Sequence, residues 1–214
     1  MEIEADIKEP KRSFGSLESM AEKENHSVWL EKKSFRIALI STFTAIAIVL
    51  GFMLALLPNI ELFTLTIFLS GFILGKRDGM IVGLLSTPVF TFFNPFGASP
   101  LPLFLYQLIH YTLTGLSGAL TKDFFKYKKY FPLNEDLYKI RIMVILGATG
   151  MVITTSFQFI SAIVSVLMLY GTINAFLPYF MIGIPFTITH LIGNTLGFTF
   201  ILPGLIQLIR KLLY

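Results

Sequence analysis

Several polar side chains lie inside long apolar stretches of this chain, at spacings that place them on shared helix faces. Tyr106 and His110 are one helical turn apart, Gln107 and His110 share a face, and so do His190 and Asn194. Each of these groups offers uncharged hydrogen-bond donors and acceptors. Polar groups in hydrocarbon are costly unless they face a bundle interior or a wet cavity, so they are candidates for binding the polar edge of a ligand. Structural bonds between helices explain them equally well.

A second polar series consists of Thr154, Gln158, Ser161 and Ser165, at steps of four, three and four residues. These steps predict a polar stripe along one side of a helix. For Ser161 and Ser165 the better explanation is helix packing with bonds back to the backbone. For Gln158 an interhelical bond and a ligand contact are equally good explanations, and the outer or middle depth of these residues favours a pocket.

We expect Gln107, His110 and Gln158 to line one outward-facing cavity. Glu61 is the one carboxylate expected on the outer side, and it suits either the mouth of such a pocket or a solvated loop.

A catalytic interpretation rests on two fragments. Gly115-Leu116-Ser117-Gly118 resembles the nucleophile motif of rhomboid intramembrane proteases, and His190 with Asn194 resembles their His-xxx-Asn pair. In that family the pair precedes the serine motif, whereas here it follows. Ser117 also lies about 8 Å from the inner boundary at Lys122, while His190 lies at mid-depth or higher. A nucleophile–base bond of about 3 Å is therefore not expected, and close helix packing explains the glycines.

Other chemistry is poorly supported by the sequence. It holds no His-Glu-x-x-His motif, no Walker motif, no Gly-x-Ser-x-Gly elbow and no cysteine. Two membrane histidines without a matched acidic ligand do not predict a metal site, and we expect no cofactor. The pI of about 9.2 reflects basic clusters without interleaved aromatic residues, so we expect no nucleic-acid partner.

The basic residues predict the topology. All 17 Lys and Arg fall at 8–36, 76–77, 122–129, 139–141 and 210–211, and the connectors around 58–61, 94–102 and 170–176 contain none. Cytoplasmic loops collect Lys and Arg. Hydrophobic residues make up 54% of the chain and charged residues 14%, against about 25% charged in soluble domains. These features predict an all-α integral membrane protein of the cell membrane, with six transmembrane helices and both termini cytoplasmic.

The predicted spans run over about 36–57, 60–75, 79–93, the segment from 103 to 121, 142–170 and 177–209. The last stretch is either one long helix or a helix broken at Pro185 or Pro203. Residues 1–35 are expected to form a polar cytoplasmic tail, with Trp29 as an interfacial anchor, and residues 36–214 form the six-helix transmembrane domain. The second and third spans are short, which is tolerated inside a bundle.

Small residues follow one another along the first span. Ala47, Gly51 and Ala55 are spaced by four, and Ala38, Thr42 and Ala45 lie nearer the cytoplasmic end. Such faces let helices approach closely, either within this bundle or against another membrane protein.

Several segments share a pattern with a known family. They are Arg36-Ile-Ala-Leu-Ile-Ser-Thr-Phe-Thr-Ala45, Pro58-Asn-Ile-Glu61, Gly71-Phe-Ile-Leu-Gly75 with Asp78, Gly79 and Gly83, and His190-Leu-Ile-Gly-Asn194 with Leu202-Pro203. Together with six short-looped spans over about 36–209, they resemble the substrate-binding S component of energy-coupling factor (ECF) vitamin transporters.

This resemblance implies a protein that captures a vitamin-like micronutrient from outside and docks on a transmembrane coupling subunit with two cytoplasmic ATPases. The chain has no nucleotide motif, so no enzymatic activity of its own is expected. The implied substrate site comprises Glu61, Asn94, Tyr106, Gln107, His110, Gln158, His190 and Asn194. The implied docking face is Ala38-xxx-Thr42 or Ser41-xxx-Ala45, and membrane lipid surrounds the bundle. Two alternatives stay open, an intramembrane hydrolase and a small membrane scaffold or assembly subunit.

Overall fold

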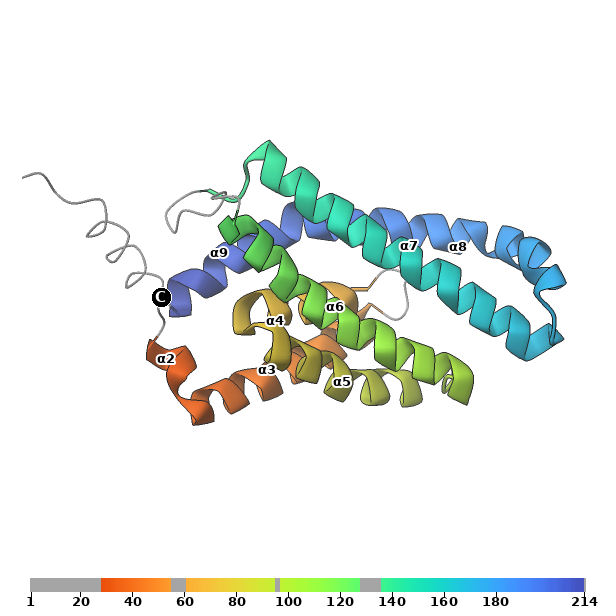
Figure 1. Ribbon diagram of the computed structural model, residues 1–214, viewed down its shortest axis with the longest axis horizontal. Helices are drawn as coiled ribbons and strands as arrows, with labels where there is room; N and C mark the ends of the chain where they lie inside the picture. The colour runs from red at the N-terminus through yellow and green to blue at the C-terminus, as the bar shows by residue number, and fades with distance from the viewer. Residues whose placement is uncertain (1–27, 55–60, 95–96, 128–135, 214) are drawn as a thin grey trace, which may run out of the picture.

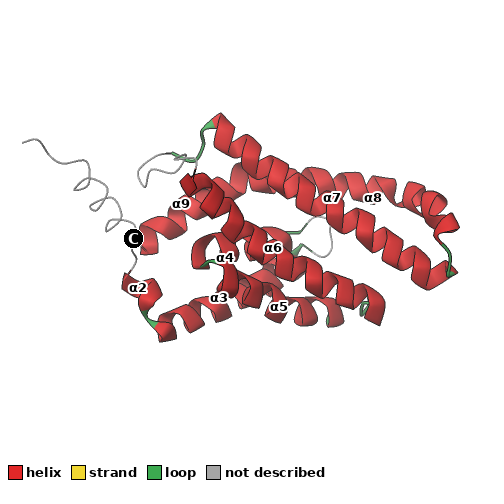
Figure 2. Cartoon of the chain, viewed as in Figure 1, coloured by secondary structure: helices red, strands yellow, loops and turns green. Residues whose placement is uncertain are grey.

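A computed structural model describes residues 28–54, 61–94, 97–127 and 136–213, and these residues form helices and connecting loops without a strand (Figures 1 and 2). In chain order the helices are α2 (Val28–Glu31), α3 (Lys33–Met53), α4 (Phe63–Leu74), α5 (Lys76–Phe92), α6 (Leu101–Tyr127), α7 (Ile140–Tyr170), η1 (Ile173–Ala175), α8 (Phe176–Leu196), η2 (Gly197–Ile201) and α9 (Leu202–Leu213). The expected all-α fold is confirmed for these residues.

Three helices in the described part of the chain are long and apolar enough to cross a membrane. They are α3, α7 and the continuous run Ile173–Leu213. Large apolar side chains also cover the outside of the molecule, as at Val49, which is 61% exposed, and Ile182, which is 78% exposed. Lipid, unlike water, solvates such a surface favourably, so the fold is that of an all-helical membrane protein.

The pair of spans predicted at 60–75 and 79–93 is built differently from two ordinary transmembrane helices. Helix α4 has 12 residues and is therefore about 18 Å long, less than the roughly 30 Å of a bilayer core. Every residue from Phe63 to Ile73 is buried, so α4 is a central packing element surrounded by its neighbours. Gly75, with φ of 98°, turns the chain into α5. The span expected at 60–75 is thus not a full-length crossing helix, and the total of six crossings stays a prediction.

Glycines allow α4, α5 and α6 to pack with their backbones in contact. A Cβ on Gly71 would lie 1.8 Å from the Gly115 carbonyl oxygen, and one on Gly118 would lie 2.0 Å from the Phe68 carbonyl oxygen. A Cβ on Gly79 would lie 2.3 Å from the Gly71 Cα. The interpretation of Gly115 and Gly118 as helix-packing residues is confirmed.

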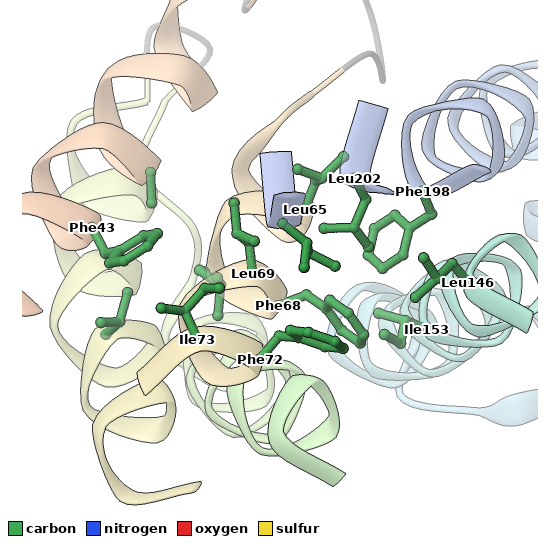
Figure 3. Close-up of a cluster of buried hydrophobic side chains, with 14 of the residues drawn as sticks. Phe43, Leu65, Phe68, Leu69, Phe72, Ile73, Leu146, Ile153, Phe198 and Leu202 are labelled. Carbon is green, nitrogen blue, oxygen red and sulfur yellow. The ribbon is translucent and has the colours of Figure 1, made fainter. Parts of the chain in front are cut away.

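Aromatic side chains join this three-helix unit to the rest of the molecule (Figure 3). The Phe68 ring on α4 lies 5.0 Å from the Phe198 ring on η2, in an edge-to-face arrangement. Leu146 on α7 and Leu202 on α9 are fully buried in the same cluster. This part of the core lies between α4 and the α7–α9 layer, and the same cluster continues to Phe43 on α3.

Ion pairs gather at one end of the molecule, where the ends of several helices meet (Figure 1). Arg36 at the start of α3 binds Asp78 on α5 at 2.6 Å, and Lys76 lies 2.9 Å from Asp123 on α6. Lys122 donates to the carbonyl of Ile73, the residue before the last of α4. The predicted clustering of basic residues at one end is therefore present, while the membrane side it faces stays a prediction.

The loop before α7 is tied to α9 at this same end. The Tyr138 backbone N–H and the Gln207 side chain both donate to Asp136 Oδ1, at 3.0 and 2.9 Å. These two hydrogen bonds, the backbone one first, hold the pKa of the exposed Asp136 carboxyl below its usual value.

The last apolar stretch is helical from Ile173 to Leu213, so it is not broken at Pro185 or Pro203. In η2 the backbone hydrogen bonds change to the wider π-helical pattern, in which the Leu202 N–H donates to the Gly197 carbonyl. Pro203 follows directly, where its missing N–H is accommodated by this wider turn.

The packed body begins before residue 36, since Leu30 and Phe35 pack against the core. Trp29 is 53% exposed, with the Lys32 ammonium 4.8 Å from its ring centre. Outside the described residues lie 1–27 of the tail expected over 1–35, Ala55, Pro58-Asn59 and residues 128–135.

Candidate functional site

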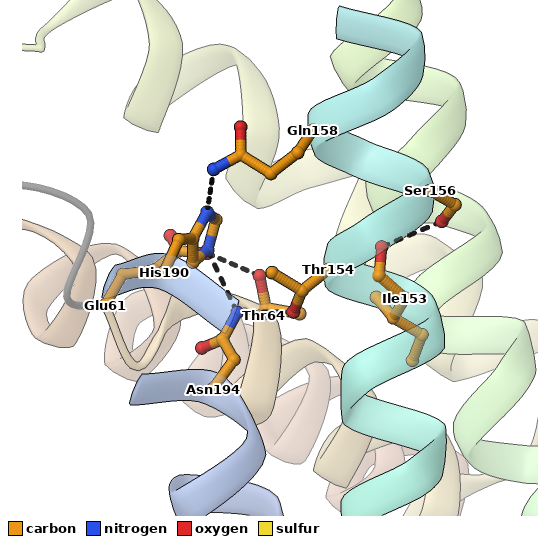
Figure 4. A network of polar contacts seen from close by, with 8 residues as sticks. All are labelled: Glu61, Thr64, Ile153, Thr154, Ser156, Gln158, His190 and Asn194. Atoms are coloured by element: carbon orange, nitrogen blue, oxygen red, sulfur yellow. Dashed lines mark hydrogen bonds and ion pairs between the residues drawn. The ribbon is translucent and has the colours of Figure 1, made fainter. Parts of the chain in front are cut away.

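His190 on α8 is the centre of a buried polar network and is 5% exposed (Figure 4). Its Nδ1 lies 2.9 Å from Nε2 of Gln158 on α7. Its Nε2 lies 3.3 Å from Oε1 of Glu61, which precedes α4, and 3.0 Å from Nδ2 of Asn194. Three segments that are far apart in the sequence therefore meet at one imidazole.

A second layer of bonds supports this centre. The Thr64 hydroxyl donates to Glu61 Oε1 at 2.5 Å, and Asn194 Nδ2 donates to the Thr154 hydroxyl at 3.0 Å. Glu61 with Thr64 are spaced by three residues, and His190 with Asn194 by four. His190 and Asn194 therefore face the same side of α8, whereas Glu61 lies in the connector before α4 and is reached by Thr64 from the first turn of that helix.

The Glu61 carboxylate can accept from His190 only when Nε2 carries the proton, in which case the Asn194 amide N–H donates to Thr154 and not to Nε2. When the Gln158 amide donates to Nδ1, the proton is carried by Nε2, which donates to the Glu61 carboxylate. Both side chains are largely withdrawn from the surface, at 12% exposure for Glu61 and 6% for His190. A buried carboxylate needs such partners, and Thr64 and His190 supply them.

Aromatic rings connect this network to α6. The Phe157 ring lies 5.0 Å from the His110 ring and 5.9 Å from the His190 ring. Tyr106 donates its hydroxyl to the Ser156 carbonyl at 3.1 Å and lies 3.5 Å from His110 Nδ1. Tyr106 and His110 are thus at the same level as His190, with Phe157 between them.

A cavity of about 440 Å³ lies between α7 and α8 beside the network. It is lined by Gln158, Ser161, Ala162, Ser165, Tyr170, Tyr179, Phe180, Ile182, Gly183, Phe186 and Thr187. This volume is within the range of sites for small organic molecules, roughly 300–1,000 Å³. Gln158 belongs to both the cavity wall and the His190 network, so a molecule in the cavity would contact the network through its amide.

Six of the eight implied site residues are brought together by the fold: Glu61, Tyr106, His110, Gln158, His190 and Asn194. Asn94 lies in the loop after α5, where its carbonyl accepts from the Gly97 N–H at 3.0 Å. Gln107 on α6 has a buried Oε1 without a hydrogen-bond partner in the described structure.

Gln107, His110 and Gln158 are expected to line one cavity. Of these three residues, only Gln158 lines the cavity between α7 and α8. The reason lies on α6. Tyr106 faces α7, and its neighbour Gln107 projects about 100° away around the helix.

Sequence reasoning missed several side chains of the site. Thr64 was detectable, since it follows Glu61 by three residues and can bond back to it. Phe157, Phe180 and Phe186 carried no such signal, because an aromatic residue on a membrane helix faces lipid as often as protein. The Thr154–Ser165 stripe was recognised, and three of its members line the cavity. Ser161 also donates back to the Gln158 carbonyl at 3.1 Å, as its packing interpretation required.

The residues of the catalytic interpretation are placed apart from one another. The Ser117 hydroxyl donates to the Thr114 carbonyl at 2.7 Å. Ser117 also lies seven residues from His110 on α6, about 10 Å along the axis from the level of His190. No group of three His, Cys, Asp or Glu side chains that could hold a metal ion occurs among the residues described here.

Helix α3 separates its small residues onto two faces. Ala47 and Gly51 are buried, and a Cβ on Gly51 would lie 2.7 Å from the Phe90 ring, so this face packs inside the bundle. The four residues of the implied docking face are instead all exposed; they are Ala38, Ser41, Thr42 and Ala45.

Comparison of the chain with protein-family models, with curated proteins and with solved structures finds no match.

Proposed function

We propose that this chain is the substrate-binding S component of an ECF-type transporter. It binds a vitamin-like small molecule from outside the cell and is energised by a transmembrane coupling subunit and two cytoplasmic ATPases. In this proposal the chain crosses the cell membrane six times with both termini in the cytoplasm, and it carries out no chemistry of its own.

The observation that carries the proposal is the position of Gln158. Its side chain lines the cavity between α7 and α8 and also bonds to His190, which is joined to Glu61. A ligand that bonds to Gln158 therefore acts on a network that holds α7, α8 and the connector before α4 together. Such a link is what a carrier needs, since occupancy of the site must alter how its helices are held.

The distribution of charge supports the orientation. The ion-paired end, with Arg36, Lys76 and Lys122, is the proposed cytoplasmic end. His190 is 14 residues from the first residue of α8, about 21 Å along the helix. The cavity lies within this segment, toward the opposite end, and therefore opens outward in the proposed topology.

The exposed small-residue face of α3 supports a partner. Ala38, Ser41, Thr42 and Ala45 leave the α3 backbone open to close approach by another helix. The sequence lacks a nucleotide-binding motif, so the energy for transport must come from such a partner.

The test is affinity isolation of the tagged chain from its native membranes, followed by protein mass spectrometry. The proposal expects a coupling membrane subunit and two ATPases in the isolated complex. Isolation of the chain without any ATPase, together with a hydrolytic activity that is lost in Ser117→Ala, would refute the proposal and favour the hydrolase.

A further inference from the structure

The cavity between α7 and α8 has two chemically different walls. Helix α7 contributes the amide of Gln158, the hydroxyls of Ser161 and Ser165, and Ala162 and Tyr170. Helix α8 contributes mainly carbon surface, above all the rings of Phe180 and Phe186. A molecule that satisfies both walls has hydrogen-bonding groups along one edge and an apolar body.

None of the lining residues carries a charge. The eleven residues are Gln, Ser, Thr, Ala, Gly, Ile, Phe and Tyr, and the chain has no Asp, Glu, Lys or Arg between Arg141 and Arg210. One carboxylate is linked to this wall through Gln158 and His190. It belongs to Glu61, which already bonds to Thr64 and His190. A charged ligand would leave water without a counter-charge, which is strongly unfavourable.

One ring of the aromatic wall, that of Phe180, is held by neighbouring rings. The Phe180 ring stacks on Phe176 with centres 5.4 Å apart, and Phe159 meets both rings edge-on at 5.3 and 6.2 Å. At the outer rim the rings of Tyr170 and Tyr179 lie 6.5 Å apart. A ring held in this way presents a fixed flat surface, against which another ring can stack.

Gly183 keeps the middle of this wall open. A Cβ built on Gly183 meets no atom within 4 Å, although the residue lies inside α8 and lines the cavity. A large side chain at this position would therefore extend into the space without first displacing the backbone.

We infer that the cavity between α7 and α8 binds an uncharged, ring-bearing molecule. The hydroxyl or amide edge of this molecule bonds to Gln158, Ser161 and Ser165, and its ring lies against Phe180 and Phe186. The identification of this molecule with the transported substrate rests on the proposed function. The selectivity of the cavity for uncharged molecules is a property of the cavity alone.

Since the chain has no cysteine, a single thiol can report on this selectivity. Ser165→Cys places a thiol in the wall with little change in size. Three methanethiosulfonates serve as probes: the uncharged benzyl reagent, the anionic sulfonatoethyl reagent and the cationic trimethylammonioethyl reagent. In each reaction the thiolate attacks the sulfenyl sulfur, a disulfide forms and methanesulfinate leaves. Ala98→Cys, in the exposed loop before α6, is the reference.

We expect the rate of the benzyl reagent, divided by that of either charged reagent, to be at least tenfold higher for Ser165→Cys than for Ala98→Cys. Adding Gly183→Trp to Ser165→Cys should slow the benzyl reaction at least tenfold. Adding Ile188→Trp, at an exposed position of α8 outside the cavity, should leave it unchanged. Gly183→Leu provides a smaller plug in case the tryptophan variant does not fold.

Equal rate ratios at the two thiols would contradict the selectivity of the cavity for uncharged molecules. A benzyl rate that neither Gly183→Trp nor Gly183→Leu slows would contradict the location of the binding site in this cavity. Neither result depends on whether the chain is isolated with ATPases. Failure of this inference and failure of the proposed function are therefore distinguishable.

Discussion

The contact between Glu61 and His190 makes a quantitative prediction about coupling across the fold. The two residues come from the connector before α4 and from α8. Glu61→Ala, His190→Ala and the double variant form a cycle that isolates the interaction of the two side chains. Glu61→Gln is a fourth variant, which keeps a hydrogen-bond acceptor and removes the charge.

The magnitude follows from what each change leaves unpaired. Glu61→Ala leaves His190 Nε2 and the Thr64 hydroxyl without their acceptor, and each such buried group costs about 1–3 kcal/mol. We therefore expect Glu61→Ala to lower the free energy of unfolding by about 3 kcal/mol. In the double variant His190 is absent, so part of this cost disappears. A hydrogen bond to a charged group contributes about 1.5–3 kcal/mol, and this is the expected coupling energy. Glu61→Gln should lose about 1 kcal/mol.

The assay is equilibrium unfolding by SDS in mixed micelles, followed by circular dichroism. A matched control pairs Glu61→Ala with Ser117→Ala, whose hydroxyl bonds within its own helix. These two changes should be additive within about 0.5 kcal/mol. If Glu61→Ala and His190→Ala are equally additive, the reasoning is refuted, because the network then does not hold α8 to the connector.

Three further predictions concern topology, docking and packing. Ser99→Cys and Lys126→Cys should be labelled from opposite sides of intact cells by an impermeant maleimide, and labelling of both from one side would contradict the six-span topology. Ala45→Trp should abolish energised uptake and leave ligand binding to the purified protein intact, because bulk on the exposed face of α3 blocks docking; loss of binding and folding as well would show that Ala45 packs inside the bundle. Gly71→Ala should lower the free energy of unfolding by about 3 kcal/mol or more, because the new Cβ would overlap the Gly115 carbonyl oxygen. Gly183 faces open space, so Gly183→Ala should change the free energy of unfolding by less than about 1 kcal/mol in the same SDS assay. Equal losses in the two glycine variants would contradict the packing described for α4 and α6.

Local features of this fold could be predicted from the sequence. The span expected at 142–170 corresponds to α7, Ile140–Tyr170, because an unbroken apolar stretch and Gly171 define both its ends. The stripe from Thr154 to Ser165 faces one side because helical periodicity is a local property. The convergence of His190, Gln158 and Glu61 was expected from the family resemblance, and the contacts now give it a geometry.

Features that depend on tertiary packing could not be predicted. Helix α4 has the composition of a membrane span, yet it is buried in protein, and composition does not distinguish a protein neighbour from a lipid one. The same ambiguity concealed the aromatic wall of Phe180 and Phe186. The three-residue spacing of Gln107 and His110 predicts that they lie on roughly the same face of a helix. Which neighbouring helix each of them contacts depends on how α6 packs on α5 and α7, and the spacing does not give that.

The most direct test of the account is mass spectrometry of the small molecules released on denaturing the protein purified from its native membranes. The wild-type chain and Ile188→Trp should both release the same uncharged, ring-bearing compound. Gly183→Trp should release none, because its side chain fills the cavity between α7 and α8. Release of no compound by the wild-type chain, or equal release by all three proteins, would contradict the claim that this cavity binds the ligand.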